Sequence, residues 1–459
     1  MQMTSSRLSK TDSGRMKNFY RSFLKLCSML VLQNVVTLSV NLADNIMLGA
    51  YSETALSGVT TVNQVQFVFQ QLLMALGDGL VIFGSQYWGR KETEPVRKIS
   101  AWAMRTGLFT AVLLFLAASF WPGKLLGLFT TDPDIIEAGV SYLEIIRFTY
   151  IFFAVTQILL ATLRCVEVAG IAFGLSLMTL VINCSINWIL IYGHFGAPSL
   201  GAAGAAVGTL VARIMEVLVL LVYIKRRQSW IGLGFKDYLT ADRNLGLKYG
   251  QIVLPLLVIQ GLWGVNTALQ TAILGHMTAA AIAANSAASN LFLMVKSAAV
   301  GAASAASVIM GKTIGTGKLD MAVAYSKKLQ KFFVIMGFTC GILLFFIRIP
   351  VLSLYRLSPE TRQLADTFLM ILSVVMVGMS YQMPTNSGII RGSGSIAYSM
   401  KVDLISTWLI VIPLSAVMAF VVKASPAVVV CCLNADQIFK CIPAFLKCNY
   451  GHWIRKMTD

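Results

Sequence analysis

The sequence predicts an all-α integral membrane protein, with twelve transmembrane helices in two six-helix lobes related by a pseudo-two-fold axis along the membrane normal. Its 459 residues are 57% hydrophobic and only 12% charged, whereas an average soluble domain has about 25% charged residues. Apolar stretches of about 20 residues recur along the chain, and each is long enough to cross a hydrocarbon core of about 30 Å as a helix. Backbone groups in lipid must bond within their own segment, so these stretches are expected to be helical.

The apolar stretches and the short polar connections between them place the individual spans. We expect spans near 23–50, 56–84, 99–121, 136–163, 169–193 and 201–224, and then near 248–275, 279–306, 327–348, 361–390, 396–422 and 425–447. The longest polar connection falls near the middle of the chain. The predicted division is a cytoplasmic N-terminal segment (1–22), a first lobe (23–224), a cytoplasmic inter-lobe loop (225–247), a second lobe (248–447) and a cytoplasmic tail (448–459).

Lysine and arginine are concentrated in alternate connections. The segments 90–98, 225–243 and 312–328 are rich in them, whereas the connections around Glu53 and His194 are not. The positive-inside rule therefore places both termini in the cytoplasm, in a multi-pass protein of the plasma (inner) membrane. The net charge of +17 is explained by this topology signal. We expect membrane lipid around the chain, no nucleic-acid partner and no obligate protein partner.

The two halves of the chain resemble each other at a spacing of about 226 residues. The matched pairs are DNIMLG (44–49) with QTAILG (270–275), Gln33 with Gln260, Gly89-Arg90 with Gly311-Lys312, and Arg164 with Arg391. Six spans per half is an even number, so the second half enters the membrane in the same orientation as the first. The repeats are therefore expected to be parallel, with a cavity between the two lobes.

One carboxylate, Asp44, lies near the end of the first span. A charged side chain at the centre of a bilayer costs about 2.5 to 3.5 kcal/mol on insertion scales, so such residues usually face a cavity or a partner. The alternative is that Asp44 only caps the span where it meets water. Its counterpart in the second half is Gln270, so the repeated architecture does not require an acid here. We therefore expect a buried acid with amide and hydroxyl neighbours in the first lobe only.

Three polar residues of the first lobe are candidates to join Asp44. Asn183 and Asn187 are one turn apart on one face of the fifth span, and Thr209 lies in the sixth. Asparagines in membrane helices most often only hydrogen-bond a neighbouring helix. Together with Asp44, the three residues would supply the oxygen atoms that a Na⁺ ion or a proton relay needs.

Other polar residues within the spans are candidates to line a substrate cavity. Asp78 lies between glycines in the second span, where it also suits a role in helix packing. Lys296 lies in the eighth span, where its long stem also suits snorkelling to an interface. The full set of cavity candidates is Gln33, Asn63, Gln66, Gln70, Asp78, Gln260 and Lys296.

The sequence lacks the common enzyme signatures. HExxH and the ATP-binding GxxxxGK[ST] loop are absent, and the eight cysteines form no CxxC pair. We expect free cysteines, no enzymatic activity and no cofactor. Uphill transport would then have to draw on an ion gradient.

Several segments together resemble the multidrug and toxic compound extrusion (MATE) family. They are NLADNIMLG in the first span, GSQYWGRKE after the second, the long block from Asn183 to Ala212, and RGSG followed by WLIVIP. The resemblance implies a two-lobe antiporter that exports organic, often cationic, compounds in exchange for H⁺ or Na⁺. It implies that the first-lobe site of the family corresponds to Asp44, Asn183, Asn187 and Thr209.

The second-lobe site of another branch of the family uses acids in spans seven and ten. Here the nearest position in span seven is Gln260, and span ten reads VGMSYQMPTNSG without an acid. A second-lobe ion site is therefore not expected. Two alternatives to an antiporter stay open: a flippase for lipid-linked precursors, and a membrane sensor or scaffold that does not transport.

Overall fold

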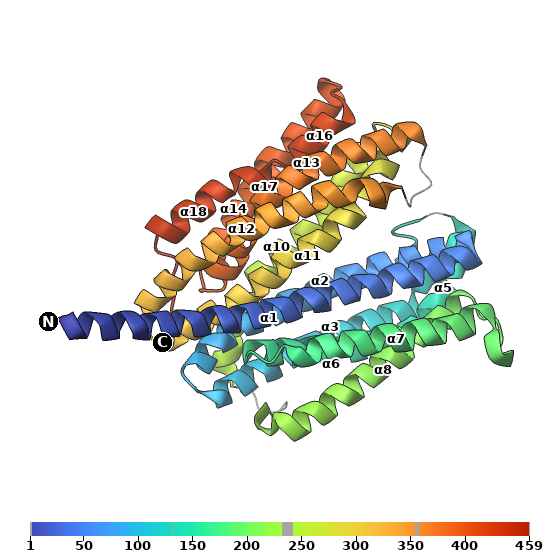
Figure 1. Cartoon of the computed structure of the whole chain (residues 1–459). Coiled ribbons are helices and arrows are strands. Elements are labelled where there is room, and N and C mark those ends of the chain that lie inside the picture. The colour runs from blue at the N-terminus through green and yellow to red at the C-terminus, as the bar shows by residue number, and fades with distance from the viewer. Residues whose placement is uncertain (1, 131, 232–241, 354–357, 459) are drawn as a thin grey trace.

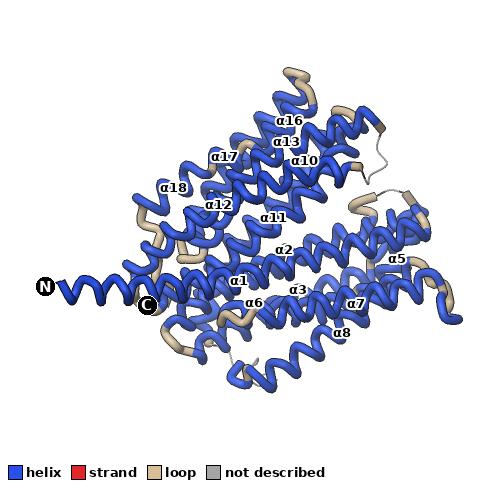
Figure 2. The backbone as a smooth tube through the Cα atoms, in the orientation of Figure 1, coloured by secondary structure: helices blue, strands red, loops and turns tan. Residues whose placement is uncertain are grey.

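The structure, a computed structural model, describes residues 2–130, 132–231, 242–353 and 358–458. The middle of the predicted inter-lobe loop and part of the turn around Arg356 lie outside these residues. The described residues form helices and connections without a strand (Figure 2). They include eleven helices that are long and apolar enough to cross a membrane, and one bent helix pair that would make a twelfth span. The predicted fold class is confirmed.

The first half of the chain forms the lower bundle in Figure 1, coloured blue to green. Its helices are α1 (Gln2–Tyr51), α2 (Glu53–Gly89), α3 (Thr93–Phe120), α4 (Pro122–Leu126), α5 (Pro133–Ile146), α6 (Thr149–Cys165), α7 (Gly170–Tyr192) and α8 (Ala202–Arg227), with the 3₁₀ turns η1 (His194–Gly196) and η2 (Ser229–Ile231). Sequence signals set several starts. The Ser52 hydroxyl caps α2, and the Asp132 carboxylate caps α5 just before Pro133.

The fourth predicted span, 136–163, is not one straight helix. Helices α5 and α6 meet at an angle of 57°, and Arg147 is the residue that ends α5. Its guanidinium carbon lies 5.3 Å from the ring centroid of Phe148 and 6.0 Å from that of Phe115. A cation within an apolar span requires such partners. The fourth predicted span is therefore present as a bent pair of helices.

The second half forms the upper bundle, coloured yellow to red (Figure 1). Its helices are α10 (Arg243–Gly275), α11 (Ala279–Gly315), α12 (Leu319–Leu352), α13 (Pro359–Met383), η3 (Pro384–Arg391), α14 (Ile396–Asp403), η4 (Leu404–Val411), α15 (Ile412–Ala416), η5 (Val417–Val421), α16 (Pro426–Asn434), α17 (Asp436–Phe439) and α18 (Cys441–Tyr450). Segments η3, η4 and η5 are π-helical. Such wide turns interrupt the tenth and eleventh spans, and in other proteins they are frequent at functional sites.

Helices α1 and α2 of the first half contact helices α10 and α11 of the second half. Small residues allow this approach. A Cβ atom on Gly301 would lie 2.5 Å from Val31, and one on Gly315 would lie 1.9 Å from the carbonyl oxygen of Gln86. Glycine at such positions lets membrane helices approach to backbone contact. From this shared end the two bundles diverge toward the opposite end (Figure 1).

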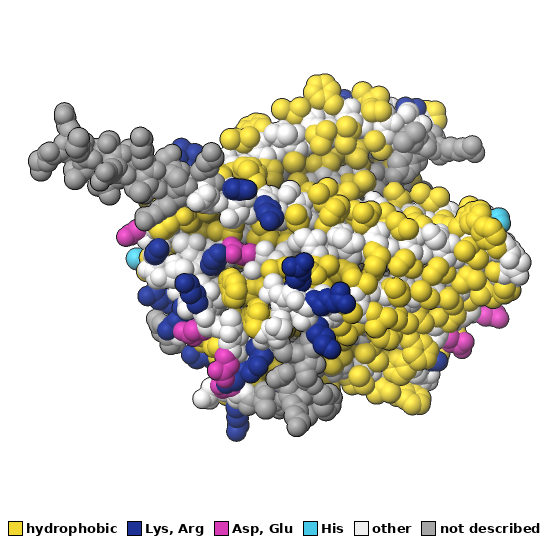
Figure 3. Space-filling model, turned by 60° about the horizontal axis from the view of Figure 1, so that its bottom comes forward, with side chains coloured by type: hydrophobic (Ala, Val, Ile, Leu, Met, Phe, Trp, Pro, Cys, Tyr) yellow, Lys and Arg dark blue, Asp and Glu magenta, His cyan; other side chains and the backbone are white. Residues whose placement is uncertain are grey.

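Basic side chains gather at one end of the molecule. In Figure 3 lysine and arginine lie mainly at the left, whereas hydrophobic side chains cover most of the rest of that face. Both ends of the chain lie at this end in Figure 1. Large apolar side chains on the outer faces are exposed, for example Phe346 on α12 and Leu409 on η4. An apolar belt with a basic end is the surface of a multi-pass membrane protein.

The C-terminal tail packs between the halves at the basic end. The Trp453 side chain is buried, and the backbone N–H of Arg455 donates to the carbonyl oxygen of Ser393 at 3.0 Å. The side chain of Gln86 on α2 donates to the carbonyl oxygen of Arg455 at 3.1 Å and accepts from the N–H of Met457 at 2.8 Å. The tail therefore connects the first half to the second.

Candidate functional site

Asp44 and its three predicted neighbours form one hydrogen-bonded chain across α1, α7 and α8. The Asn187 Nδ2 group donates to Asp44 Oδ1 at 2.7 Å and lies 3.2 Å from Asn183 Oδ1. The Asn183 Nδ2 group in turn donates to Thr209 Oγ1 at 3.1 Å. The structure therefore brings together all four residues that the sequence proposed for an ion or proton site. We call these four residues the polar cluster.

The local sequence explains why these helices approach so closely. Helix α8 begins with AAGAAVG, and a Cβ atom on Gly208 would lie only 2.1 Å from Asn187 Oδ1. A Cβ atom on Gly204 would lie 2.7 Å from the backbone of Leu190. Small residues on α8 thus leave room for the amide groups of α7. Asn183 and Asn187 are buried, whereas Asp44 is half-buried.

Two buried oxygen atoms beside the polar cluster lack a hydrogen-bond donor among the described residues. They are Asn187 Oδ1 and, two turns earlier on α7, the hydroxyl oxygen of Thr179. Leaving a buried polar atom unpaired costs about 1 to 3 kcal/mol. Amide and hydroxyl oxygens next to a carboxylate are the ligands that hard cations prefer. The donor set therefore suits a small hard cation, and Asn187 Oδ1 also suits a proton carried by Asp44.

An intramembrane ion pair next to the polar cluster was missed by the sequence reasoning. Arg213 lies one turn after Thr209 on α8, and its Nη1 is 2.7 Å from Glu216 Oε2. Its guanidinium carbon lies 4.8 Å from the ring centroid of Phe153 on α6. Opposite charges three residues apart within the apolar segment ARIMEV were the available signal. The pair adds a cation and a second carboxylate to this end of the first half.

The predicted cavity candidates do not form one group. Asn63 is exposed, and Gln33, Gln66 and Gln70 are half-buried. Gln260 on α10 is reached from the first half by Gln71, which was not among the candidates, with 3.5 Å between Gln71 Nε2 and Gln260 Oε1. The first-half side chain that reaches Gln260 is thus one position after the predicted Gln70.

Asp78 lies far from the polar cluster. Asp44 is seven residues from the end of α1, whereas Asp78 is 25 residues from the start of the antiparallel α2. At 1.5 Å per residue these offsets are about 10 Å and about 38 Å. Asp78 therefore belongs to the basic end, where Arg164 and Arg391 act on it electrostatically.

The second half also contains buried acids, which the sequence reasoning did not find, and they are paired with cations. In the second half Lys440 Nζ lies 2.9 Å from Asp436 Oδ2 and 3.2 Å from Asp403 Oδ1, and Arg391 Nη2 lies 3.1 Å from Asp403 Oδ2. Asp436 and Lys440 are both about 5% exposed. The comparison of the halves overlooked these acids because it compared only the positions that match first-half site residues. The i,i+4 pair in NADQIFK was the signal that could have found them.

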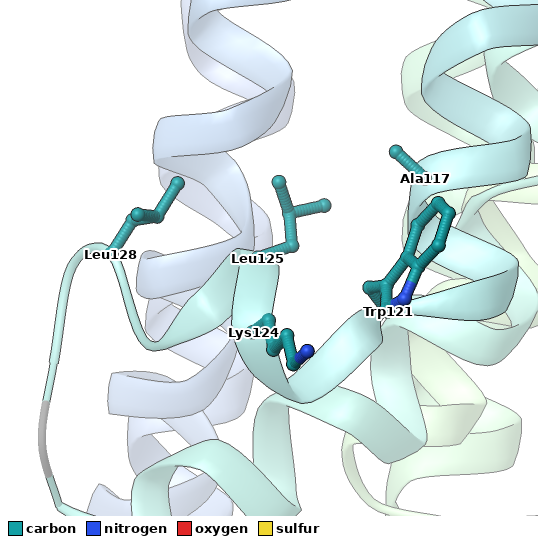
Figure 4. Close-up of a pocket in the computed structure, with 5 residues that line it drawn as sticks. All are labelled: Ala117, Trp121, Lys124, Leu125 and Leu128. Atoms are coloured by element: carbon teal, nitrogen blue, oxygen red, sulfur yellow. The ribbon is translucent and has the colours of Figure 1, made fainter.

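Two surface hollows lie outside the polar cluster. One, of about 400 Å³, is lined by Ala117, Trp121, Lys124, Leu125 and Leu128 at the end of α3 (Figure 4). The other, of about 530 Å³, lies between α12 and α13 and is lined mainly by apolar side chains, including Phe338 and Phe345. Neither contains a residue that the sequence proposed for a site.

Comparison with known proteins agrees with this architecture. The family model MatE matches residues 30–189 and 249–417. A protein of Thermotoga maritima named "Probable multidrug resistance protein NorM" is 23% identical over 95% of this chain and 93% of its own length. The "Probable multidrug resistance protein YoeA" of Bacillus subtilis is also 23% identical, over 90% of each chain.

Solved structures resemble the fold closely. A mutant of the Vibrio cholerae MATE transporter VcmN superposes with a TM-score of 0.86, at 16% identity, over 94% of this chain and 96% of its own. A structure titled "Outward-facing conformation of a multidrug resistance MATE family transporter of the MOP superfamily" gives a TM-score of 0.83 at 17% identity, over 93% of this chain and 94% of its own. With a family model matching most of its length, this chain belongs to the MATE family of multidrug efflux transporters.

Proposed function

We propose that this protein is a secondary antiporter that exports small organic compounds, often cationic, in exchange for H⁺ or Na⁺. The proposal rests mainly on one observation, the hydrogen-bonded chain from Asp44 through Asn187 and Asn183 to Thr209. The family membership and the names of the relatives support the export of organic compounds. The polar cluster supplies the residue set for the coupling ion.

Occupation of the polar cluster would change how α1 is connected to α7. As a carboxylate, Asp44 only accepts a hydrogen bond, and Asn187 Nδ2 donates one at 2.7 Å. A protonated Asp44 gains a donor, and the unpaired Asn187 Oδ1 is the neighbouring acceptor. A Na⁺ ion would instead draw both oxygens toward itself. Either event changes the bonding between the two helices, because protonation adds a hydrogen bond and Na⁺ adds a shared ligand.

This change in bonding gives the coupling a physical basis. A ligand shifts a conformational equilibrium only by its difference in affinity for the two states. The ion and the exported compound therefore need not share atoms, provided that each favours a different arrangement of α1 against α7 and α8. Transport then follows when the two states open to opposite sides.

The proposed side of ion entry rests on the position of the basic end. If that end is cytoplasmic, as the positive-inside rule predicts, the described arrangement is closed toward the cytoplasm. Lys312 on α11 pairs with Glu167 after α6 at that end, and the C-terminal tail packs beside them. Asp44 lies toward the other end, so the coupling ion would enter from outside the cell.

The experiment that tests this function is ion movement in reconstituted vesicles. Purified protein is placed in vesicles that contain a pH-sensitive or a Na⁺-sensitive dye, and an organic cation such as ethidium is added. We expect ethidium-dependent movement of H⁺ or Na⁺. A flippase would move labelled lipid in the absence of ethidium. A sensor or scaffold would move no lipid, no ethidium and no ion. Each of these two results would reject the antiporter.

A further inference from the structure

Lys296 carries a charge in the middle of a membrane-spanning helix. It lies 17 residues from the start of α11 and 19 from its end, or about 26 Å and 29 Å along the axis. A lysine at this depth costs at least about 2.5 kcal/mol on insertion scales and is usually paired or faces a cavity. Its surroundings therefore show what it is suited to bind.

Among the described residues, no carboxylate lies within salt-bridge distance of Lys296. The acid that acts on it most is Asp436, and both oxygens of that carboxylate are already engaged. Asp436 Oδ2 is 2.9 Å from Lys440 Nζ, and Asp436 Oδ1 accepts from Gln437 Nε2 at 2.9 Å. Asp436 is therefore already paired with another cation, and within the part of the chain that the structure describes Lys296 has no carboxylate partner of its own.

The contact that Lys296 does make is with an aromatic ring. Its Nζ lies 5.3 Å from the ring centroid of Trp263 on α10, a cation–π contact. The Trp263 ring lies 5.7 Å from that of Phe67 on α2, in the other half of the molecule. Trp263 is 37% exposed and Lys296 is half-buried. A free ammonium group and two accessible rings therefore meet where the halves face each other.

We propose that Lys296, Trp263 and Phe67 form a binding point for aromatic organic anions, compounds that carry a carboxylate or sulfonate on a planar ring system. The anionic group pairs with Lys296, and the ring packs against Trp263 and Phe67. This inference rests on the proposed function, because it extends the range of exported compounds from cations to anions. The amide pair Gln71–Gln260, one turn before Trp263, offers neutral hydrogen-bonding groups beside the rings.

The test compares two dyes that share the xanthene ring system, anionic carboxyfluorescein and a cationic rhodamine. Binding to purified protein is measured by fluorescence anisotropy, and transport is measured in vesicles with an imposed ion gradient. The variants are Lys296→Gln, Lys296→Arg and the control Lys401→Gln, which removes an exposed lysine on α14. Circular dichroism and size-exclusion chromatography establish that each variant is folded.

We expect wild type to bind and move both dyes. Lys296→Gln should weaken carboxyfluorescein binding and transport by about tenfold or more, because it removes a charge-assisted contact, and should leave rhodamine within about twofold. Lys296→Arg keeps the positive charge and should therefore keep carboxyfluorescein binding. Lys401→Gln should change neither dye.

Two results would overturn the proposal while leaving the antiporter intact. One is a wild type that moves rhodamine but neither binds nor moves carboxyfluorescein. The other is a folded Lys296→Gln variant that handles both dyes as wild type does. If wild type moves neither dye and no H⁺ or Na⁺, the proposed function fails, and the anion site fails with it.

Discussion

Replacing Asp44 with asparagine should uncouple transport while leaving the fold intact. The substitution keeps an oxygen that can accept from Asn187 Nδ2, which now lies 2.7 Å from Asp44 Oδ1. A hydrogen bond to an ionised acceptor is roughly twice as strong as a neutral one, so we expect a stability loss of about 1 kcal/mol. Asparagine cannot take up a proton and offers a cation no negative charge.

The loss of coupling should be much larger than the loss of stability. A tenfold gradient of the coupling ion supplies about 1.4 kcal/mol, which in one-for-one exchange holds about a tenfold gradient of the exported compound. In Asp44→Asn that ratio should fall to about one, while downhill movement of the compound continues. The assay is steady-state ethidium accumulation in vesicles with an imposed ion gradient. Asp134→Asn, on the exposed first turn of α5, is the matched control. Wild-type accumulation by the Asp44→Asn variant would remove this carboxylate from the mechanism.

Three further substitutions test the packing around the sites. Gly208→Ala should lower the free energy of unfolding by about 1 to 3 kcal/mol and impair coupling, because its Cβ would lie 2.1 Å from Asn187 Oδ1. Gly174→Ala is the control, because its Cβ would meet nothing within 4 Å. It should be neutral or slightly stabilising in the same unfolding assay. Gln86→Ala removes two hydrogen bonds to the tail and should make the tail more sensitive to protease at unchanged overall fold; equal cleavage of wild type and variant would contradict the packing described. Lys440→Met leaves the carboxylates that Lys440 contacts without that cation and should cost about 3 to 5 kcal/mol, against no measurable change for Lys401→Met.

The sequence was sufficient for the fold class and for the choice of the four residues that the structure brings together in the polar cluster. Apolar stretches of span length predict the number of helices, because backbone groups in lipid must bond within their own segment. Asn183 and Asn187 are one turn apart, so their common face was readable from the helical period. Their contact with Asp44 depends on Gly208, whose importance appears only when α7 and α8 are packed together.

Other features had weak signals in the sequence or none. The tail is bonded mainly through its own backbone groups. The Ser395 hydroxyl donates to the Trp453 carbonyl oxygen, and the Arg455 N–H donates to the Ser393 carbonyl oxygen, so the residue types of the tail carry little of the signal. At the bend between α5 and α6, the contact of Arg147 with Phe115 on α3 forms only when the helices are packed together. The second-half acids had a signal in their i,i+4 spacing to Lys440. That signal was missed because attention was restricted to positions matched between the halves.

The two halves therefore share a scaffold but place their charges at different depths. Asp44 lies about 10 Å from the C-terminal end of α1, and that end is opposite the basic end of the molecule. Lys440 is ten residues from the end of α18 at Tyr450, or about 15 Å from the basic end. In the first half, the carboxylate accepts from an amide, and a neighbouring buried oxygen is unpaired. In the second half, Asp403 and Asp436 are each paired with a cation. Only the first arrangement can gain a proton or a cation without first breaking an ion pair, so under the proposed antiport the first half is the one expected to respond to an ion gradient.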